Sequence, residues 1–354
     1  MPVHHHRANA VAIATHSRLR HGEYNACQTP QPEVDMRAVQ IVEPGRMEII
    51  DIPAPKPGAG QVLTRTAMVS ICGSDWPVAL YGRPDVTYPL EPGRPCHEIV
   101  SIVESSDHPE FTPGDRVLSI APPAYDGLRE YHVRDRHEII TLPADRPLEE
   151  VILCQPLGVV LRMCRKWPNI LGWNAAVIGQ GSIGMMFTLM LRQLGAHKIM
   201  TLDLEDYRLG ISRAIGATHT SNPSREDPIK FVMDLTNGQG ADIVVEAVGM
   251  AETANMTIPL VRRGGYITMY GIQKTSPVAL DLIALVRREV TLLTTQAGDR
   301  DLDYGLARDL IVSGQVNMPA LITHKFPVTD IRKAFELAHD RKDGVVKIGL
   351  QFDA

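Results

Sequence analysis

The sequence predicts a two-domain α/β protein, with a small β-barrel domain and a doubly wound parallel sheet. Three observations predict it. At 354 residues the chain is longer than one average domain. Residues 36–145 contain short β-branched runs broken by Pro and Gly clusters, which is typical of a small barrel. Beyond residue 145, strand and helix patterns alternate, as they do in a parallel sheet with crossover helices.

Composition excludes several classes of partner. The 36 Lys and Arg against 41 Asp and Glu give a net charge of −5, so nothing electrostatic favours nucleic acid or an anionic membrane as a partner. No uncharged apolar run approaches the ~18 residues that cross a bilayer. Five cysteines are too few for a disulfide scaffold, so they are interpreted as thiols or metal ligands in a reducing compartment. We therefore expect a cytoplasmic protein.

Residues 1–35 differ from the rest of the chain. They hold five of the thirteen histidines and show no hydrophobic period, and their apolar stretch is too short for a signal peptide. A histidine-rich tract can bind metal, but a tag remnant or an upstream start is the favoured interpretation. We expect a disordered N-terminal extension, with the folded protein starting at Met36.

Periodicity then predicts each element in order. In the first domain the expected strands are Arg37–Val42, Met47–Asp51, Gln61–Ser70, Ile99–Glu104, Asp115–Ile120, Tyr131–Val133 and Glu138–Thr141. A helix is expected over Glu149–Trp167, followed by strand Ala175–Ile178, helix Ile183–Leu194, strand Lys198–Leu202, helix Arg208–Ile215, strand Asp242–Glu246, helix Ala254–Val261 and strand Tyr266–Tyr270. The tail after Gln296 is expected to form helices Leu302–Ser313 and Asp330–Ala338 and a final strand Val345–Phe352.

A glycine-rich turn indicates a nucleotide site. Strand Ala175–Ile178 runs into Gly179-Gln180-Gly181-Ser182-Ile183-Gly184, and an apolar helix follows. One glycine permits the tight turn, one the close approach of backbone to a pyrophosphate, and one the packing of helix on strand. The helix N-terminus adds unpaired N–H groups and a positive dipole end for the phosphates. A lone turn of this kind is weak evidence, but the strand before it and the helix after it agree.

An acidic residue at the end of the next strand supports this interpretation. Asp203 lies 19 residues beyond Gly184, where its carboxylate accepts hydrogen bonds from the adenosine ribose. The same charge repels a 2′-phosphate, so NAD is predicted rather than NADP. Arg208 either contacts a phosphate or is a solvated helix charge.

A second group of residues points to a metal. Cys72 follows strand Gln61–Ser70, and His97 and Glu98 come 25 residues later. Thiolate, imidazole and carboxylate are ligands that a tetrahedral zinc accepts, and a catalytic zinc keeps one position open. Singly these residues are a small buried hydrophobe, a core histidine and a surface charge, but together, upstream of a nucleotide fold, they predict one catalytic zinc.

At this point the chain resembles the zinc-containing medium-chain dehydrogenase/reductase family, particularly its polyol (sorbitol) dehydrogenase branch. The resemblance runs from about Met36 to the C-terminus. It implies a GroES-like catalytic domain over residues 36–156 and 297–354, with a Rossmann NAD-binding domain over residues 157–296. Its marks are Gly73-Ser74-Asp75 after Cys72, His97-Glu98, Gly114-Asp115-Arg116-Val117, Glu130-Tyr131, Gln155-Pro156-Leu157, the glycine turn, Asp203 with Arg208, and Glu246-Ala247-Val248-Gly249.

The resemblance also implies residue roles. Cys72 and His97 match zinc ligands, and Glu98 matches a third ligand or a transient one. Ser74 matches the hydroxyl that passes on the substrate proton, which completes the catalytic set, and Asp75 matches the acid that holds the ligand histidine. Cofactor contacts are implied for Gly179, Gly181, Ser182, Ile183, Gly184, Asp203, Arg208, Val248, Gly249, Tyr270, Gly271 and, near the pyrophosphate, Lys347.

Four departures from the family pattern matter. Gln155 stands where a Glu or Cys is typical, so zinc is bound more weakly or with an extra water. Cys96 replaces a glycine and is either a spare thiol or a packing residue. Trp76 and Pro77 occupy the stretch of a relay histidine. The ten residues from Leu118 to Gly127 contain no cysteine, so no structural zinc is expected.

The predicted function is a zinc-dependent alcohol or polyol dehydrogenase that transfers a hydride from a secondary alcohol of a sugar, cyclitol or sugar alcohol to NAD. Two alternatives stay open: a zinc-free enoyl or quinone reductase of the same superfamily, and a non-catalytic nucleotide-binding protein. The expected partner is a small polyol or sugar-like molecule, with Trp76, Tyr81, Tyr125 and Arg129 as candidate cleft residues. The family resemblance also implies a homo-oligomer, either a dimer or a tetramer.

Overall fold

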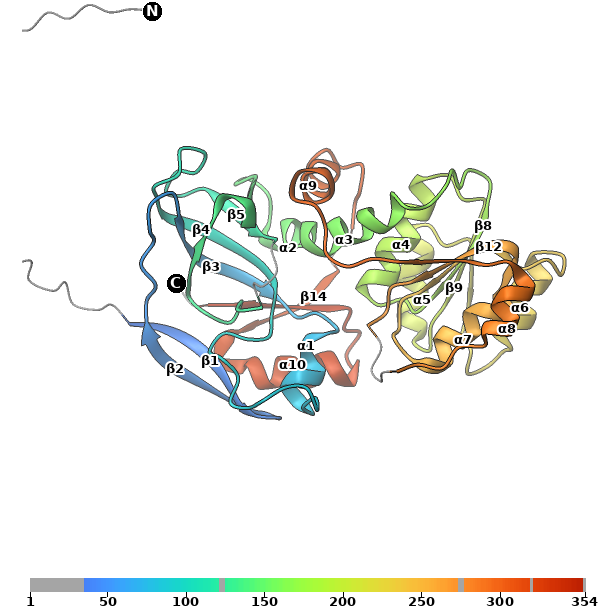
Figure 1. Cartoon of the computed structure of the whole chain (residues 1–354), viewed down its shortest axis with the longest axis horizontal. Coiled ribbons are helices and arrows are strands. Elements are labelled where there is room, and N and C mark those ends of the chain that lie inside the picture. The colour runs from blue at the N-terminus through green and yellow to red at the C-terminus, as the bar shows by residue number, and fades with distance from the viewer. Residues whose placement is uncertain (1–34, 121–124, 273–276, 319–320, 353–354) are drawn as a thin grey trace, which may run out of the picture. The chain divides into compact units, whose positions relative to one another are not determined.

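The computed structural model describes residues 35–120, 125–272, 277–318 and 321–352 (Figure 1). The first strand begins at Asp35, one residue before the predicted start of the fold. The expected N-terminal extension lies, apart from Asp35, outside the described residues. The described residues from Asp35 onward belong to one compact unit.

The first group of strands forms the predicted barrel-like domain. A seven-stranded sheet has the order β14-β15-β3-β4-β5-β7, with β6 also paired to β3, and β1 and β2 form a separate antiparallel hairpin. Along β3, residues 62, 64, 66 and 68 are fully buried and alternate with half-buried neighbours, as expected of a strand with one face on a core. The strands are β1 (Asp35–Glu43), β2 (Arg46–Pro53), β3 (Val62–Ser70), β4 (Glu98–Ser106), β5 (Arg116–Ser119), β6 (Tyr131–Arg134), β7 (Ile139–Leu142), β14 (Ile322–Pro327) and β15 (Lys347–Gln351).

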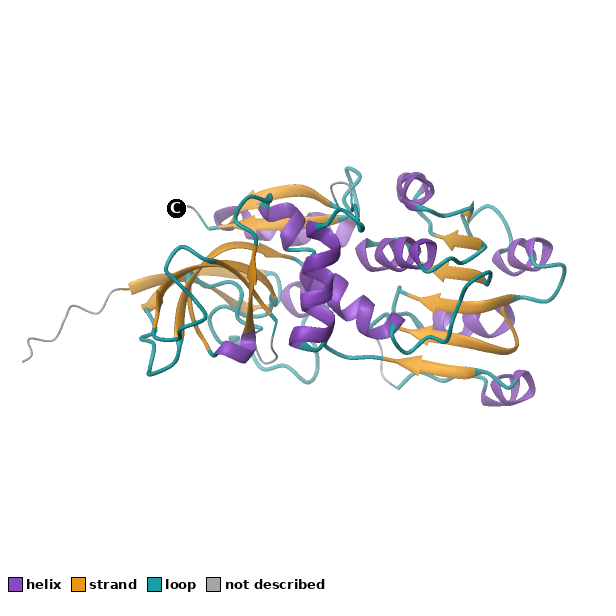
Figure 2. Ribbon diagram, turned by 90° about the horizontal axis from the view of Figure 1, so that it is seen from above, coloured by secondary structure: helices purple, strands orange, loops and turns teal. Residues whose placement is uncertain are grey.

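The second group forms a six-stranded parallel sheet with the order β10-β9-β8-β11-β12-β13. This is the doubly wound order: β9 and β10 are added on one side of β8, and β11, β12 and β13 on the other. Figure 2 shows helices on both faces of this sheet. The elements are β8 (Asn174–Ile178), α4 (Ser182–Gln193), β9 (Lys198–Leu202), α5 (Asp206–Ile215), β10 (His219–Ser221), α6 (Pro228–Leu235), β11 (Ala241–Glu246), α7 (Ala251–Leu260), β12 (Val261–Met269), α8 (Leu282–Arg288) and β13 (Thr291–Thr294).

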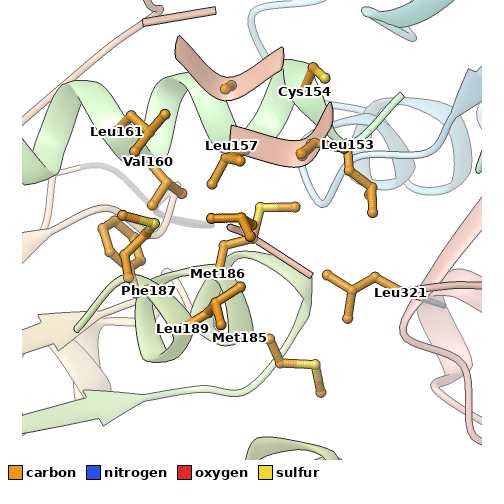
Figure 3. Packing of buried hydrophobic residues seen from close by; sticks show 14 of the residues in the cluster. Leu153, Cys154, Leu157, Val160, Leu161, Met185, Met186, Phe187, Leu189 and Leu321 are labelled. Carbon is orange, nitrogen blue, oxygen red and sulfur yellow. The ribbon is translucent and has the colours of Figure 1, made fainter. Parts of the chain in front are cut away.

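A continuous apolar core surrounds helices α3 (Cys154–Cys164) and α4. Figure 3 shows Leu157 and Val160 of α3 above Met186 and Phe187 of α4. All of these side chains are fully buried, which at about 1.5–3 kcal/mol each relative to exposure makes this packing a major part of the stability. The same cluster includes side chains of β4 and β5.

The predicted fold class is confirmed: a mixed barrel-type sheet is followed by a doubly wound parallel sheet, and the C-terminal strands return to the first sheet. That return is made by β14 and β15, because β15 pairs with β3 through Gly349 and Leu350. The domain limits at residues 156 and 296 stay predictions. None of the described helices is long and apolar enough to span a membrane.

Several elements differ from expectation. The predicted helix Glu149–Trp167 is two helices, α2 (Leu148–Val151) and α3, because the chain turns at Ile152 and Leu153. The six-residue helix α1 (Asp75–Leu80) was not predicted, since it is shorter than two helical turns. The predicted helix Leu302–Ser313 begins as a π-helical turn, Arg300–Tyr304, before α9 (Gly305–Val312). Helix α10 (Ile331–Asp340) matches its prediction closely.

Candidate metal and nucleotide site

Strand pairing brings the three predicted metal ligands together. β3 and β4 are antiparallel, with Ser70 opposite Glu98, so the chain that leaves β3 toward Cys72 lies beside the chain that enters β4 from His97. The ligand atoms of Cys72, His97 and Glu98 all lie within 4.8 Å of one another. Among the described residues this is the one group of three or more His, Cys, Asp and Glu side chains placed to hold a metal ion.

The buried carboxylate of Asp75 lies next to two of the three ligands, Cys72 and His97. Asp75 is 1% exposed, and its Oδ2 accepts a hydrogen bond from the Cys72 backbone N–H at 2.8 Å. Its Oδ1 lies 3.4 Å from His97 Nδ1, too poorly aligned for a full hydrogen bond, so that ring nitrogen is buried without a well-formed partner. Because Nδ1 faces the Asp75 carboxylate, Nε2 is the ring nitrogen left to act as the ligand atom.

The electrostatics of the group suit a cation. Burial lowers the pKa of His97, but the Asp75 and Cys72 side chains more than offset this and hold the pKa well above its usual value. A site that stabilises a proton on a buried imidazole also stabilises a metal ion there, since both are positive charges among the same anions. Together with the sulfur, nitrogen and oxygen donors, this shows that the residues present fit a zinc ion.

Glu98 already has a strong partner. Its Oε2 lies 2.6 Å from Lys347 Nζ, and both side chains are almost completely buried. The Ser70 hydroxyl donates to the same oxygen. Burial lowers the pKa of Lys347, but the nearby Glu98 and Cys72 charges outweigh it and raise the pKa. The resemblance implies a place near a pyrophosphate for Lys347, whereas in the structure its ammonium pairs with Glu98 and donates to the Ile71 carbonyl at 3.3 Å.

Of the predicted aromatic cleft residues, Tyr125 contacts a metal ligand. Ser74 is the N-cap residue of α1 and is half-buried. The Tyr125 ring packs edge-on to the His97 imidazole, with ring centres 5.2 Å apart. Trp76 and Tyr81 pack with the His339 ring instead.

Two departures from the family pattern have defined positions. Cys96 is fully buried in the apolar cluster that contains Ile99 and Leu128, which favours the packing interpretation. Burial raises the pKa of its thiol further above the usual value, and Asp75 adds to this. Gln155 lies in the first turn of α3 and is 8% exposed.

The glycine turn has the geometry that its sequence predicts. Gly179 follows β8 with φ +89°, and a Cβ there would lie 2.5 Å from Val248 Cγ2. A Cβ on Gly184 would lie 1.9 Å from the Gly179 carbonyl oxygen, so only glycine lets α4 start this close to the strand. Gly181 is the N-cap of α4, and Ser182 and Ile183 are its first two residues.

Asp203 has structural partners that the sequence did not reveal. Its Oδ2 accepts a hydrogen bond from the Gln180 N–H at 2.6 Å, and its Oδ1 accepts one from the Glu205 N–H at 2.9 Å. The carboxylate therefore joins the end of β9 to the glycine turn. Each oxygen keeps a second lone pair that can accept a ribose hydroxyl.

Arg208 is buried beside the same turn rather than solvated on its helix. It is 7% exposed. Its Nη2 donates to the Val345 carbonyl at 3.0 Å and its Nε to the Tyr207 hydroxyl at 2.9 Å. Its Nη1 is about 4.0 Å from the place of a Cβ on Gly181, which puts a positive charge at the mouth of the turn.

The residues predicted to line the nicotinamide lie on two touching loops. Val248 and Gly249 follow β11, and Tyr270 and Gly271 follow β12. A Cβ on Gly271 would lie 2.2 Å from the Gly249 nitrogen, so the two backbones are in direct contact. The Tyr270 ring packs edge-on to Phe187 of α4 at 5.0 Å. Burial raises the pKa of Tyr270 well above its usual value, and Cys72 adds to this.

A hollow elsewhere on the chain is not part of this site. It has a volume of about 410 Å³ and is lined by charged residues that include Glu110, Arg136 and Arg300. Glu110 forms ion pairs with both arginines. The hollow shares no residue with the metal group or the glycine turn.

Together, the doubly wound sheet, the glycine turn and the sulfur, nitrogen and oxygen group define a nicotinamide-dependent oxidoreductase of the metal-binding type. The chain belongs to the zinc-containing medium-chain dehydrogenase/reductase family and is polyol dehydrogenase-like. The family described as "Alcohol dehydrogenase GroES-like domain" matches residues 58–142, and the one described as "Zinc-binding dehydrogenase" matches residues 182–312. It is an oxidoreductase that acts on CH–OH groups.

Individual relatives agree with this assignment. An alcohol dehydrogenase of Cupriavidus necator is 29% identical over 89% of this chain and 98% of its own length. Human sorbitol dehydrogenase is 27% identical over 83% of this chain and 90% of its own length. The solved structure of alcohol dehydrogenase TADH from Thermus sp. ATN1 matches with a TM-score of 0.79 and 25% identity, over 90% of this chain and all of that one.

Proposed function

We propose that this protein is an NAD-dependent dehydrogenase that oxidises a secondary alcohol of a sugar, cyclitol or sugar alcohol. The observation that carries the proposal is the group of Cys72, His97 and Glu98, whose ligand atoms lie within 4.8 Å of one another. The zinc and NAD that the family implies would supply, when bound, a Lewis acid for the substrate hydroxyl and an acceptor for its hydride.

The metal would be held by Cys72 Sγ and the His97 imidazole. Glu98 would be a third ligand that alternates between the metal and its ion pair with Lys347. Asp75 orients the imidazole from the side of Nδ1. Lys347 keeps the Glu98 carboxylate compensated when it is not a ligand. Ser74 is proposed to carry the substrate proton away, since it follows Cys72 by two residues and its hydroxyl can both accept and donate.

NAD would lie along the carboxyl ends of β8, β9 and β11, where the strand order reverses. Gly179, Gly181, Ser182, Ile183 and Gly184 would hold the pyrophosphate at the N-terminus of α4. Asp203 would accept hydrogen bonds from the ribose and repel a 2′-phosphate, which supports NAD over NADP. The remaining proposed contacts are Arg208 beside the phosphates, and Val248, Gly249, Tyr270 and Gly271 beside the nicotinamide. Lys347 is proposed to act on the cofactor indirectly, by holding Glu98.

A polyol rather than a simple alcohol is proposed from the family branch and from the relatives named for sorbitol. The aromatic ring of Tyr125 beside His97 supports this, because sugars pack on such rings and a phenol can hydrogen-bond to a second hydroxyl. Arg129 is a poor candidate for substrate contact, since its Nε donates to the Pro92 carbonyl at 2.6 Å.

We also propose a homo-oligomer built at the edge of the parallel sheet. In the described part of the chain β13 pairs on one side only, with β12. The adjoining helix α8 exposes Leu282, Ile283 and Val286, each by more than 60%. An open strand edge beside an apolar face is suited to a second copy, and sedimentation of the purified protein would show it.

Metal analysis and a substrate panel test the main proposal. Purified protein should contain about one zinc per chain and reduce NAD with polyols, which is measured by NADH absorbance. Cys72→Ser should lose the metal and turnover but still bind NADH. Cys164→Ser is the matched control, because that thiol lies at the end of α3 and should keep both. Turnover that persists in metal-free protein would contradict the proposal and favour the zinc-free reductase.

A further inference from the structure

A buried carboxylate outside the metal group connects the two nicotinamide loops. Glu246 is the last residue of β11 and is fully buried. Its Oε1 accepts hydrogen bonds from the backbone N–H groups of Val248 and Gly249, each at 2.9 Å. The Thr253 hydroxyl donates to the same oxygen at 2.7 Å. Three donors on one oxygen are what an ionised carboxylate accepts well.

The backbone of the same residue holds the other loop. The Glu246 carbonyl accepts hydrogen bonds from the N–H groups of Tyr270 and Gly271, both at 3.0 Å. One residue therefore fixes the loop after β11 through its side chain and the loop after β12 through its main chain. These are the two loops that carry Val248, Gly249, Tyr270 and Gly271.

The second carboxylate oxygen is the unusual feature. In the described part of the chain Glu246 Oε2 is buried and has no hydrogen-bond partner, and no ion pair involves this side chain. It lies against the second loop, because a Cβ on Gly271 would be 2.5 Å from it. A buried oxygen left unpaired costs about 1–3 kcal/mol of stability. An amide oxygen could accept from the same three donors without a buried charge, so the role of acceptor alone does not require a carboxylate here.

We propose that Glu246 is a positioning residue of the nicotinamide site, whose buried negative charge favours the oxidised, cationic nicotinamide over the neutral reduced ring. The proposal rests on the proposed function, since it takes the two loops to flank the nicotinamide. The carboxylate charge acts on the nicotinamide ring by Coulomb attraction, and because the side chain is fully buried, little water screens it. The enzyme would then bind NAD more tightly, relative to NADH, than an uncharged loop anchor would allow.

The experiment separates charge from shape. Glu246→Gln can present its amide oxygen to the same three donors while removing the charge. Glu246→Asp keeps the charge but shortens the reach to the donors. Glu252→Gln is the matched control, because Glu252 lies on α7 next to Thr253 but is exposed to solvent. Dissociation constants of NAD and NADH are measured on the full, chelator-treated chain by calorimetry and by NADH fluorescence, so that no turnover is needed.

For Glu246→Gln we expect the Kd of NAD to rise roughly three- to tenfold, while the Kd of NADH stays within about twofold of wild type. Glu246→Asp should weaken both nucleotides equally, and Glu252→Gln should change neither. The proposal would be overturned by an unchanged ratio of the two dissociation constants in Glu246→Gln, whether both stay at wild type or both rise by the same factor.

Two further outcomes are informative. If Glu246→Gln does not fold, Glu246→Asp still tests the loop anchor, and wild-type affinity for both nucleotides in that variant would overturn it. If the wild-type chain binds neither nucleotide, the proposed function fails and this proposal fails with it. Wild-type binding with an unaltered ratio in Glu246→Gln removes only the present proposal.

Discussion

Replacing Lys347 with Met should destabilise the protein strongly, because it leaves the Glu98 carboxylate buried without a counter-charge. Lys347 Nζ and Glu98 Oε2 are 2.6 Å apart, with the two side chains 3% and 1% exposed. At an effective dielectric constant of about 20, their gross attraction is roughly 6 kcal/mol. Desolvation offsets most of this in the intact pair, but removal of one partner typically costs about 3–5 kcal/mol. Methionine keeps the apolar stem, so packing changes little.

The assay is thermal and urea unfolding of the chelator-treated protein, so that metal binding does not add to stability. A loss of 3–5 kcal/mol corresponds to a fall in Tm of about 4–7 °C for a chain of 354 residues. The double variant Lys347→Met with Glu98→Gln should be more stable than Lys347→Met alone, since no uncompensated charge remains. Lys342→Met is the control, because Lys342 is 70% exposed and such pairs contribute little. A loss below about 1 kcal/mol in Lys347→Met, or strictly additive effects in the double variant, would refute this reasoning.

Three other predictions follow from the same structure. Asp203→Ala should raise the KM for NAD and narrow the preference for NAD over NADP, and an unchanged ratio of kcat/KM for the two cofactors would argue against its ribose role. Tyr125→Phe keeps the ring beside His97 and should raise the KM for polyols several-fold but not that for a simple secondary alcohol; equal effects on both substrates would assign the hydroxyl no part in recognition. Burial, reinforced by Arg134, lowers the pKa of His132 below its usual value despite the nearby Asp126 carboxylate. The unfolded chain therefore binds a proton near pH 6.5 that the native chain does not, so stability should fall as pH drops below about 6.5. His132→Gln should flatten that part of the profile in unfolding measurements between pH 5 and 8.

The parts of the site that the sequence predicts are those set by short-range geometry. The glycine turn is an example, because Gly184 and Gly179 are five residues apart and a Cβ on Gly184 would meet the Gly179 carbonyl. The fold class follows in the same way from the alternation of elements, since each strand–helix unit is local. Cys72 and His97 were grouped from the sequence by their ligand chemistry, and the antiparallel pairing of β3 with β4 is the structural reason that they meet.

What the sequence does not predict depends on contacts between distant segments. The Lys347–Glu98 pair needs β15 to add to β3, a pairing across more than 270 residues that no local pattern encodes. Asp203 was expected to face a ribose, but its bond to the Gln180 N–H appears only once β9 lies beside β8. Helix α1 was missed because six residues are too few for a hydrophobic period to show.

The C-terminal strand explains why the tail returns to the first sheet after the parallel sheet is complete. The carbonyl of Val345, just before β15, accepts hydrogen bonds from Arg208 and from the Tyr207 hydroxyl on α5. Two residues later Lys347 pairs with Glu98 of the metal group, and Gly349 then pairs with Ser70 at the end of β3. Five residues of backbone thus join the helix beside the glycine turn to the strands that hold the metal ligands. Since a hydride transfer requires both groups in one fixed geometry, loss of the Val345 contacts should misplace the two sites relative to each other without disturbing either one. Tyr207→Phe removes one of these contacts and leaves Arg208 in place. It should therefore lower kcat in NADH-absorbance assays while zinc content, the Kd of NADH and the free energy of urea unfolding stay near wild type, and an unchanged kcat would contradict the argument.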